Sequence, residues 1–404
     1  MNKPIVQLLY NGGIKDVTNR KSALGSYIYT LSALLNNAYE VYINHHIFTE
    51  HGKLPVAKDI KSGVVKPHQP VRVSPLKSYF PISLKLVLKD FHSILKSLRI
   101  CAKSYSTKAN VYIEFYSYLS LTGYILSKIR KKPLILIYDG PVEEEYVFFN
   151  GAKPPLRIFV HLFQNLTLQR AQNVIVYSES VAKYLTNRFG INRRKILIHQ
   201  NVDFSRFDII KRDYSKIRKE GTINLGFIGS FLKWHRVDLL LYAFFSLREE
   251  GYNVKLYLIG HGMEYESIKG KVEESEFRDD VILTGFLDGE ELRHYKQMIH
   301  IGIMPSSNWY GAPAKIFEYG AAGMGVIAPS TPTIADLFPD FENEGVLLFK
   351  NNDLNELLSS IRKCLDNREL LIKISSNLHE KIIRDYNKGN TFNFYSSLIK
   401  ALYK

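Results

Sequence analysis

Short apolar runs of strand length alternate with longer amphipathic stretches in two successive blocks of this 404-residue chain. Runs such as "NVYIEF" and "PLILIY" are short and rich in β-branched and aromatic residues, which favours strands over helices. In the first block we expect strands at 4–10, 40–44, 110–115, 133–138, 173–177 and 195–199, and helices at 22–36, 82–103, 117–130, 155–170 and 179–189. In the second block we expect strands at 222–228, 253–259, 280–284, 299–304, 325–328 and 345–349, with helices between them. Strands that alternate with helices form parallel sheets, so the pattern predicts two doubly wound α/β domains.

The length of the chain supports the same division, because 404 residues exceed what one hydrophobic core usually serves. A charged and weakly patterned stretch, "KRDYSKIRKEG", separates the two blocks and indicates a linker. We expect a first domain at 1–210, the linker at 211–221, a second domain at 222–385 and a C-terminal helix within 386–404. Ligands of doubly wound sheets bind beyond the carboxyl ends of the strands, so a site is expected in the loops that follow them.

Charge is divided unevenly along the chain, whose net charge is +15. Residues 1–210 contain 29 Lys and Arg against 13 Asp and Glu, whereas residues 211–404 contain 25 against 26. The excess therefore lies in the first half, which suggests that this half meets an anionic partner such as a membrane surface or a phosphorylated substrate. No basic motif with interleaved aromatic residues is present, so we expect no nucleic-acid partner.

One stretch of the first half, "SLKLVLKDFHSILKSLRICAK", combines this positive charge with helical periodicity. Residues 51–110 around it hold 12 basic side chains and only two acidic ones. Two interpretations fit: a helix that buries its apolar stripe on the first sheet, or a helix that rests on anionic lipid headgroups. The apolar stripe consists of Leu84, Val87, Leu88, Phe91, Leu95 and Leu98.

Cysteine use and hydropathy limit the compartment and the chemistry. The two cysteines, Cys101 and Cys364, lie far apart and lack metal-ligand spacing, so a reduced compartment fits and a disulfide framework does not. No run of eighteen apolar residues is present, and "IVQLLY" directly after Pro4 is typical of a strand and not of a secretory signal. Neither half shows an Asp-x-Asp or a histidine cluster, so we expect no metal ion and a cytoplasmic protein.

Glycines follow two successive strands of the second half. Gly229 precedes Ser230 at the end of "INLGFIGS", and Gly260 and Gly262 end the run "VKLYLIGHG". A glycine directly after a strand lets the backbone approach a ligand closely, and the helix that follows offers free N–H groups to an anion. Each glycine alone is compatible with a simple tight turn. Together they favour a phosphate-binding site at the edge of the sheet where these strands end.

The stretch "SSNWYGAPAKIFEYGAAG" follows a later strand of the same half and carries a positive charge in an unusual place. Pro313 suits the first position of a helix and Gly323 the position after its end, which puts Lys315 in the first turn, where a cation opposes the helix dipole. Glu318, three residues on, shares a face with it. Two interpretations follow. The two residues form a surface ion pair, or Lys315 binds an anion while Glu318 accepts hydrogen bonds from hydroxyl groups. The diphosphate and the ribose of a nucleotide would supply that anion and those hydroxyl groups.

The ordered segments "GFIGSFLKWHRVDLLLYAF", "LIGHGM", "VILTGFL" and "GAPAKIFEYGAAGMGVIAP" resemble the donor-binding half of retaining GT-B glycosyltransferases, in the bacterial branch called glycosyltransferase family 4. In the first half, "SALGSYIYTLSALL", "PLILIYDGPVEEEY", "VIVYSESVAKYL" and "ILIHQNVDFSRF" agree with the same family. The resemblance covers nearly the whole chain. It implies two Rossmann-like parallel-sheet domains that face a cleft, with the donor on the second domain and a last helix that crosses back to the first.

The resemblance also implies an activity. A sugar would pass from a nucleotide-sugar donor to a hydroxyl of a saccharide or lipid-linked acceptor, with retention and without a protein nucleophile, in the synthesis of bacterial surface polysaccharide or glycoconjugate. The basic half would then suit a peripheral position on the inner face of the plasma membrane. Two alternatives remain: a sugar-nucleotide epimerase of the same fold, and a non-catalytic partner subunit that binds nucleotide or membrane.

Site residues follow from the resemblance, position by position. The catalytic candidates are Lys315, Glu318, Asp139 and His235. The donor-binding candidates are Gly229, Ser230, Arg236, Gly260, Gly262, Phe286, Tyr310, Gly311, Ala312 and Pro313, together with Lys315 and Glu318. The acceptor-side candidates are Gly12, Gly13, Gly25, Asp139 and Gly140, the last two standing where relatives often carry a His-Gly pair. The neighbouring Glu143, Glu144 and Glu145 indicate a solvated run, unless one of them faces the cleft.

The chain departs from the family pattern in its donor half. Tyr310 stands where many relatives carry the first of two glutamates. Ser230 and His235 occupy the positions at which relatives place arginine and lysine on the diphosphate, and Arg236 replaces a common glycine. We expect Lys315 to supply the phosphate-binding charge that these exchanges remove.

Overall fold

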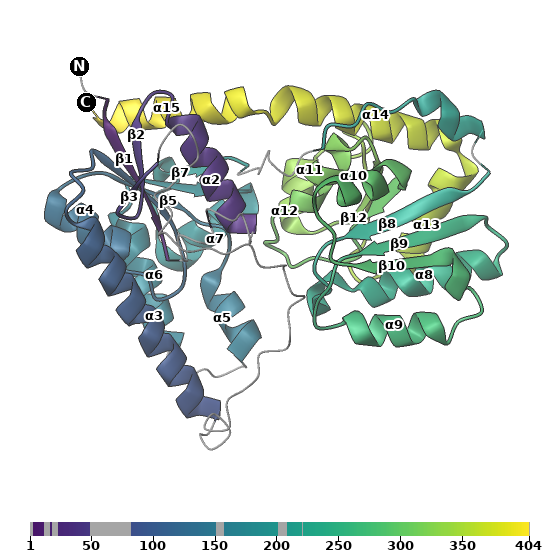
Figure 1. The fold of residues 1–404 in the computed structure, drawn as a ribbon, viewed down its shortest axis with the longest axis horizontal. Coiled ribbons are helices and arrows are strands. Elements are labelled where there is room, and N and C mark those ends of the chain that lie inside the picture. The colour runs from purple at the N-terminus through teal and green to yellow at the C-terminus, as the bar shows by residue number, and fades with distance from the viewer. Residues whose placement is uncertain are drawn as a thin grey trace, which may run out of the picture. The chain divides into compact units, whose positions relative to one another are not determined.

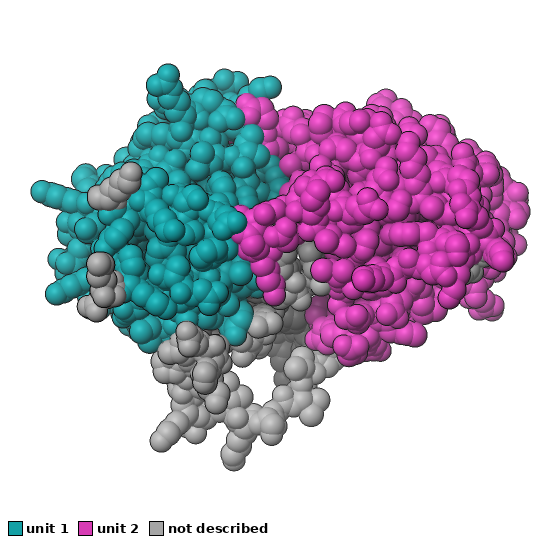
Figure 2. Space-filling view, turned by 90° about the horizontal axis from the view of Figure 1, so that it is seen from above, with its two compact units in different colours: residues 1–177, 182–201, 391–404 teal, residues 178–181, 202–390 magenta. Residues whose placement is uncertain are grey.

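The computed structural model describes residues 3–11, 17, 23–48, 82–150, 157–200, 208–219 and 221–403 (Figure 1). The chain divides into two compact units (Figure 2). Unit 1 comprises residues 1–177, 182–201 and 391–404, and unit 2 comprises residues 178–181 and 202–390. Each unit is built on a largely or wholly parallel sheet, which confirms the predicted fold class.

Unit 1 is centred on a seven-stranded sheet. Its strands are β1 (Ile5–Tyr10), β2 (Glu40–Ile43), β3 (His46–Ile47), β4 (Val111–Phe115), β5 (Leu134–Ile137), β6 (Asn173–Val176) and β7 (Ile196–Ile198). They lie in the order β3-β2-β1-β4-β5-β6-β7, and every pair is parallel except β2 with β3. All six expected strands are present. The additional strand, β3, was not predicted, because two residues are too few to show a period.

The helices of unit 1 are α2 (Ala23–Leu35), α3 (Ile82–Ser104), α4 (Thr122–Arg130), α5 (Val142–Asn150), α6 (Arg157–Arg170), α7 (Glu179–Phe189) and α15 (Lys388–Tyr403), with a 3₁₀ turn at Arg193–Lys195. Apolar residues of α2 and α15 share one core with the sheet: Ile28 and Leu31 from α2 pack with Leu8 and Ile113, and Ile399 of α15 belongs to the same cluster. The last helix therefore contributes directly to the core of unit 1.

Helix α3 turns its polar side inward. Asp90 and Ser97 are buried, and Ser97 Oγ lies 2.9 Å from Thr122 Oγ1 of α4. Three of its large apolar side chains are exposed by 53, 56 and 42%: Leu88, Phe91 and Leu98. The interpretation in which this apolar stripe is buried on the sheet is therefore wrong for these three residues.

Buried polar side chains of the sheet have partners on α3 and in the loop before α4. Gln7 Nε2 on β1 donates to the carbonyl oxygen of Ser104 on α3 at 3.4 Å. Glu114 on β4 is also buried and accepts a hydrogen bond of 2.7 Å from the Ser120 hydroxyl. Burial raises the pKa of Glu114 to about 7 against this hydrogen bond. A polar sheet face needs polar partners, and α3 supplies some of them.

Unit 2 contains a six-stranded sheet in which every pair is parallel. Its strands are β8 (Ile223–Ile228), β9 (Val254–Ile259), β10 (Val281–Gly285), β11 (Ile301–Ile303), β12 (Gly325–Pro329) and β13 (Val346–Phe349), in the order β10-β9-β8-β11-β12-β13. The helices are α8 (Val237–Glu249), α9 (Tyr265–Glu273), α10 (Gly289–Met298), α11 (Ala314–Ala321), α12 (Pro332–Leu337), α13 (Leu354–Asp366) and α14 (Arg368–Asp385). Each predicted strand of this half is present.

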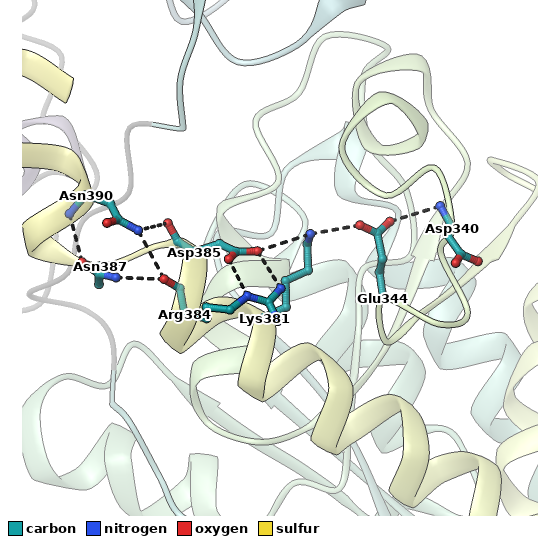
Figure 3. A network of polar contacts seen from close by, with 7 residues as sticks. All are labelled: Asp340, Glu344, Lys381, Arg384, Asp385, Asn387 and Asn390. Atoms are coloured by element: carbon teal, nitrogen blue, oxygen red, sulfur yellow. Dashed lines mark hydrogen bonds and ion pairs between the residues drawn. The ribbon is translucent and has the colours of Figure 1, made fainter. Parts of the chain in front are cut away.

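A polar network fixes the carboxyl end of α14, where the chain turns into α15 (Figure 3). Asn390 Nδ2 donates to the carbonyl oxygen of Asp385 at 3.0 Å, and the Asn390 N–H donates to Asn387 Oδ1 at 3.0 Å. One turn earlier, Lys381 forms an ion pair of 2.9 Å with Glu344. The side chains thus cap orphan carbonyl groups of α14.

Because Ile399 is fully buried in the core of unit 1, Ile399→Ala should lower the free energy of unfolding by about 2–5 kcal/mol. Lys400→Ala changes an exposed neighbour on the same helix and should stay within about 0.5 kcal/mol. Calorimetric unfolding measures both. Deletion of residues 391–404 should destabilise unit 1 further, and an unchanged unfolding profile of that deletion variant would contradict the structural role of α15.

Candidate functional site

The strand order of unit 2 reverses at β8, which has β9 on one side and β11 on the other. In open parallel sheets, ligands bind beyond the carboxyl ends of the strands at such a reversal. The loops that follow β8 and β11 therefore define the first place to look. They carry most of the donor-binding residues predicted from the sequence, and α11 begins directly after the second loop.

The loops after β8 and β9 pack backbone against backbone. The Gly229 N–H donates to the carbonyl oxygen of Ile259 at 2.9 Å. Gly260 has a φ of +137°, and a Cβ there would lie 1.9 Å from the Gly229 oxygen. A Cβ on Gly262 would similarly lie 2.6 Å from the backbone nitrogen of Phe231. Glycine at these positions is therefore required by close backbone contact.

Lys315, the second residue of α11, contacts His235 across the two loops. Its Nζ lies 3.0 Å from His235 Nε2, and His235 Nδ1 lies 2.6 Å from the carbonyl oxygen of Ser230. Because a carbonyl oxygen only accepts, Nδ1 carries the proton and Nε2 offers its lone pair to the ammonium group. Burial and the charge of Lys315 lower the pKa of His235 to about 3, so the imidazole is neutral at pH 7.

Among the described residues, no carboxylate forms an ion pair with Lys315. Within the described part of the chain its contacts are His235 and the ring of Phe227, whose centroid lies 5.5 Å from Nζ. A Cβ on Gly229 would lie 2.6 Å from Lys315 Cε, so the lysine lies directly on the glycine loop. Burial lowers the pKa of Lys315 to about 8 against the opposing charge of Glu318. This cation at a helix start can therefore receive an anion.

Glu318 pairs with a different lysine. Its Oε1 lies 2.7 Å from Nζ of Lys296, whose side chain is only 1% exposed. The interpretation of Lys315 and Glu318 as a surface ion pair is therefore wrong, because each has another partner. Both nevertheless project from the first turns of α11 at the strand-order reversal.

The charge of Arg236 is paired with the nearby carboxylate of Asp238, in the first turn of α8. Its backbone has a φ of +47°, in the left-handed region that favours glycine, which explains why a glycine suits this position in relatives. Its guanidinium group bonds to both carboxylate oxygens of Asp238, at 2.9 and 3.0 Å. Arg236 thus has less charge to offer a ligand than Lys315 has.

The other predicted donor residues lie in the loops after β8, β10 and β11. Ser230 is exposed, and Phe286, directly after β10, is 76% exposed. The turn before α11 consists of Tyr310, Gly311, Ala312 and Pro313, of which Tyr310 and Pro313 are buried. Pro313 directly precedes α11 and does not occupy its first position as predicted.

In unit 1, Asp139 lies just beyond the carboxyl end of β5. The Tyr177 hydroxyl donates to Asp139 Oδ1 at 2.6 Å. Desolvation raises the pKa of Asp139 to about 6, although the bond from Tyr177 acts in the opposite direction. On α5, burial and the charge of Asp139 raise the pKa of Glu145 to about 7. Two carboxyl groups with raised pKa values thus lie near this edge of the sheet.

The other acceptor-side candidates are backbone positions. Gly140 is buried beside Asp139, and Gly25 is buried within α2. Gly12 and Gly13 lie outside the described residues. The structure thus describes three of the five predicted acceptor-side residues, all in unit 1.

The interpretation of residues 143–145 as a solvated run is wrong for Glu143. This residue is buried on α5, with Oε1 2.9 Å from Arg157 Nε and Oε2 3.0 Å from His161 Nδ1 of α6. The acidic run opens a helix, where carboxylates favour the dipole. Glu143 therefore joins α5 to α6, whereas Glu144 is exposed.

Sequence reasoning missed Lys296 and its second partner, Asp208, whose Oδ2 lies 2.9 Å from Lys296 Nζ. A signal was present on α10. Leu292, Tyr295 and Ile299 pack in the core at helical spacing, and Lys296 occupies the same face. A lysine on an apolar helix face is rarely buried without a paired charge.

Across the described ranges, no helix is long and apolar enough to cross a membrane. No group of three or more His, Cys, Asp or Glu side chains in those ranges could hold a metal ion. Cys101 and Cys364 are both buried, and neither is in a disulfide.

Comparison with known families decides the class of protein. Residues 210–381 match the family "Glycosyl transferases group 1", and residues 24–206 match "Glycosyltransferase Family 4". The chain belongs to glycosyltransferase family 4. The predicted family is confirmed.

Individual relatives agree with this family. The chain is 27% identical, over 177 residues, to a protein named as a teichuronic acid biosynthesis glycosyltransferase, TuaH of Bacillus subtilis (strain 168). That match covers 42% of this chain and 43% of the relative. The fold is similar to that of Anabaena HepE, solved in complex with UDP, with a TM-score of 0.69, 15% identity and coverage of 99 and 100% of the two chains. It is also similar to WaaG, a glycosyltransferase involved in lipopolysaccharide biosynthesis, with a TM-score of 0.61, 13% identity and coverage of 98 and 99%. Both neighbours support the GT-B fold.

Because burial lowers the pKa of Lys315 to about 8 and only its charged form attracts an anion, affinity for a nucleoside diphosphate should fall as the pH rises through this value. The fall should approach about tenfold per pH unit between about pH 8.5 and about pH 9.5. The last ionisation of the diphosphate, at about pH 6, is complete before this range. Isothermal titration calorimetry measures the affinity, and Lys315→Arg, which stays charged throughout, should abolish the fall. A wild-type affinity that is constant over this range would contradict the assignment.

Proposed function

We propose that this chain transfers a glycosyl group, with retention, from a nucleoside diphosphate sugar bound by unit 2 to a hydroxyl group of a saccharide or lipid-linked acceptor bound by unit 1. The observation that carries the proposal is the Lys315 ammonium group. It lies in the first turn of α11, at the strand-order reversal, and contacts no carboxylate among the described residues. The diphosphate of a sugar nucleotide would supply the missing negative charge.

In this reaction, the bond between the anomeric carbon and the β-phosphate oxygen breaks while a bond to the acceptor oxygen forms on the same face of the sugar. The proton of the acceptor hydroxyl passes to the departing diphosphate, so no side chain acts as nucleophile. Lys315 and the N–H groups at the start of α11 would stabilise the charge that grows on the leaving diphosphate. Their contribution is electrostatic, and they are in place before the donor binds.

His235 would serve as a positioning residue for Lys315. Its imidazole is neutral and is oriented by the Ser230 carbonyl group, so it holds the ammonium group without neutralising it. Lys315 would thereby provide the charge that relatives place at the positions of Ser230 and His235. The glycine loop, on which the lysine lies, leaves the backbone open to the phosphates.

The two acidic candidates would each bind hydroxyl groups of a substrate. We propose that Glu318 accepts hydrogen bonds from the ribose, because it lies one turn from Lys315 on α11. We propose that Asp139, held by the Tyr177 hydroxyl, orients a hydroxyl of the acceptor or of the donor sugar. Its raised pKa makes this contact stronger as the pH rises through about 6.

The names of the relatives suggest which substrates to test first. HepE was solved with UDP, so a UDP-sugar is the first donor to examine. TuaH and WaaG are named for teichuronic acid and lipopolysaccharide biosynthesis. We propose the same broad role for this chain, the synthesis of a bacterial surface polysaccharide or glycoconjugate in the cytoplasm.

Lys315→Ala and Glu318→Ala should each lower turnover by about 100-fold or more, because each removes a group that stabilises or positions the donor. Lys350→Ala, at a lysine that is 74% exposed and belongs to the same unit, is the matched control and should leave turnover unchanged. Donors are first identified by thermal shift with UDP-, GDP- and ADP-sugars. Turnover is then measured as release of the nucleoside diphosphate in the presence of acceptor sugars.

Acceptor dependence separates the three possible activities. A transferase releases free nucleoside diphosphate only when an acceptor is supplied. An epimerase would convert the sugar without releasing the nucleotide, and a non-catalytic binder would do neither. Wild-type affinity and turnover in both the Lys315 and Glu318 variants would overturn the site assignment.

We further propose that unit 1 docks on an anionic lipid surface through α3, at the inner face of the plasma membrane. Lys89 and Arg99 on this helix are exposed, beside the exposed apolar side chains of Leu88, Phe91 and Leu98. Apolar side chains beside basic ones suit the boundary between headgroups and acyl chains, and each basic side chain there contributes about 1 kcal/mol. A lipid-linked acceptor would then lie at the same surface as the acceptor-binding unit.

Co-sedimentation with phosphatidylcholine vesicles that contain increasing phosphatidylserine tests this docking. Binding should rise with the anionic lipid and fall with salt, and Phe91→Ser with Leu98→Ser should weaken it by about tenfold or more. Lys89→Glu with Lys96→Glu should remove its dependence on anionic lipid. Ile383→Ser, at a side chain that is 42% exposed in unit 2, is the control. Equal binding of all variants, or indifference to lipid charge, would contradict the proposal.

A further inference from the structure

Lys296 lies between two carboxylates in the interior of unit 2. Its Nζ is 2.9 Å from Asp208 Oδ2 and 2.7 Å from Glu318 Oε1. Burial acts to lower the pKa of Lys296, but the two carboxylates outweigh it and raise the pKa above the usual value. The side chain is therefore a buried ammonium group that both partners stabilise.

The two carboxylate partners of Lys296 among the described residues come from different parts of the chain. Glu318 is on α11, one turn from Lys315. Asp208 lies between the two segments that match the family, residues 24–206 and 210–381. Arg293 Nη1 also approaches Asp208 Oδ1, at 3.8 Å, so α10 holds this connecting segment through two basic side chains.

This pairing leaves the Glu318 carboxylate able to bind a ligand. Oε1 lies 2.7 Å from Lys296 Nζ, and no other side chain among the described residues pairs with this carboxylate. The side chain keeps 17% exposure, so the carboxylate is anchored at one oxygen while the residue still reaches solvent. A carboxylate held in this way loses little freedom when a ligand hydroxyl binds to it, which increases the strength of that contact.

We propose that Lys296 is a positioning residue that orients Glu318 toward the ribose hydroxyls of the donor, and that this orientation makes the site select ribonucleotides over 2′-deoxyribonucleotides. The inference rests on the proposed function. Lys296 itself is buried and acts through Glu318. A site built to bind a hydroxyl rejects the analogue that lacks it, because its own polar group is then left unpaired.

Lys296→Met tests the proposal, because it removes the charge but keeps an unbranched side chain of similar length. The affinities of UDP and 2′-deoxy-UDP are measured by calorimetry on the full chain, and GDP and ADP are compared with their 2′-deoxy forms in the same way. The wild-type protein should prefer the ribose form of the nucleotide it binds by about tenfold or more. In Lys296→Met this preference should fall to about twofold, with affinity for the 2′-deoxy form almost unchanged.

Asp208→Asn is the matched control. It removes the other ion pair of Lys296 and leaves the contact with Glu318, so the preference for ribose should remain. If Lys296→Met does not fold, the double variant Lys296→Met with Asp208→Asn is measured instead. In the double variant only one carboxylate, that of Glu318, loses its cation.

An equal loss of affinity for the ribose and 2′-deoxy forms would show a merely structural role for Lys296 and overturn the proposal. A preference that is absent from the wild-type protein, or unchanged in the variant, would overturn it as well. A wild-type chain that binds no nucleoside diphosphate would instead overturn the proposed function on which the inference rests.

Discussion

A lysine ammonium group held by a neutral imidazole is the interaction on which the donor side of unit 2 depends. Lys315 lies 3.0 Å from His235 Nε2, and the contact is possible because Gly229 has no Cβ to occupy the space of the lysine side chain. The nearby Glu318 does not neutralise Lys315, because Lys296 already holds it. Lys315 therefore forms no ion pair among the described residues, and its charge can meet a ligand at the start of a helix, where an anion is favoured.

Much of the fold could be predicted from the sequence, because buried parallel strands appear as continuous apolar runs. The failures have local physical causes. β3 has only two residues and pairs antiparallel at the edge of its sheet. The orientation of α3 was not predictable from its own periodicity, because its buried Ser97 pairs with Thr122 of α4, a partner that the sequence of the helix does not show.

The candidate site could be predicted in part. Glycines after strands and a lysine at a helix start indicate an anion-binding site, and a single sequence is enough to show them. Ion pairs between distant residues cannot be predicted in this way. Lys296 and Asp208 are 88 positions apart, and no local sequence pattern indicates their contact. Glu143 shows the same limit, because its place in an acidic run indicated solvent exposure until its partners on α6 were known.

A crystal structure of the chain with UDP tests the central claim most directly, because it locates the anion that Lys315 receives. The diphosphate should lie over the Gly229 loop at the start of α11, with a phosphate oxygen within hydrogen-bond distance of Lys315 Nζ and His235 still bonded to that lysine. The ribose hydroxyls should contact Glu318. A nucleotide bound elsewhere, or a diphosphate that leaves Lys315 without a contact, would contradict the assignment of this edge of unit 2 as the donor site.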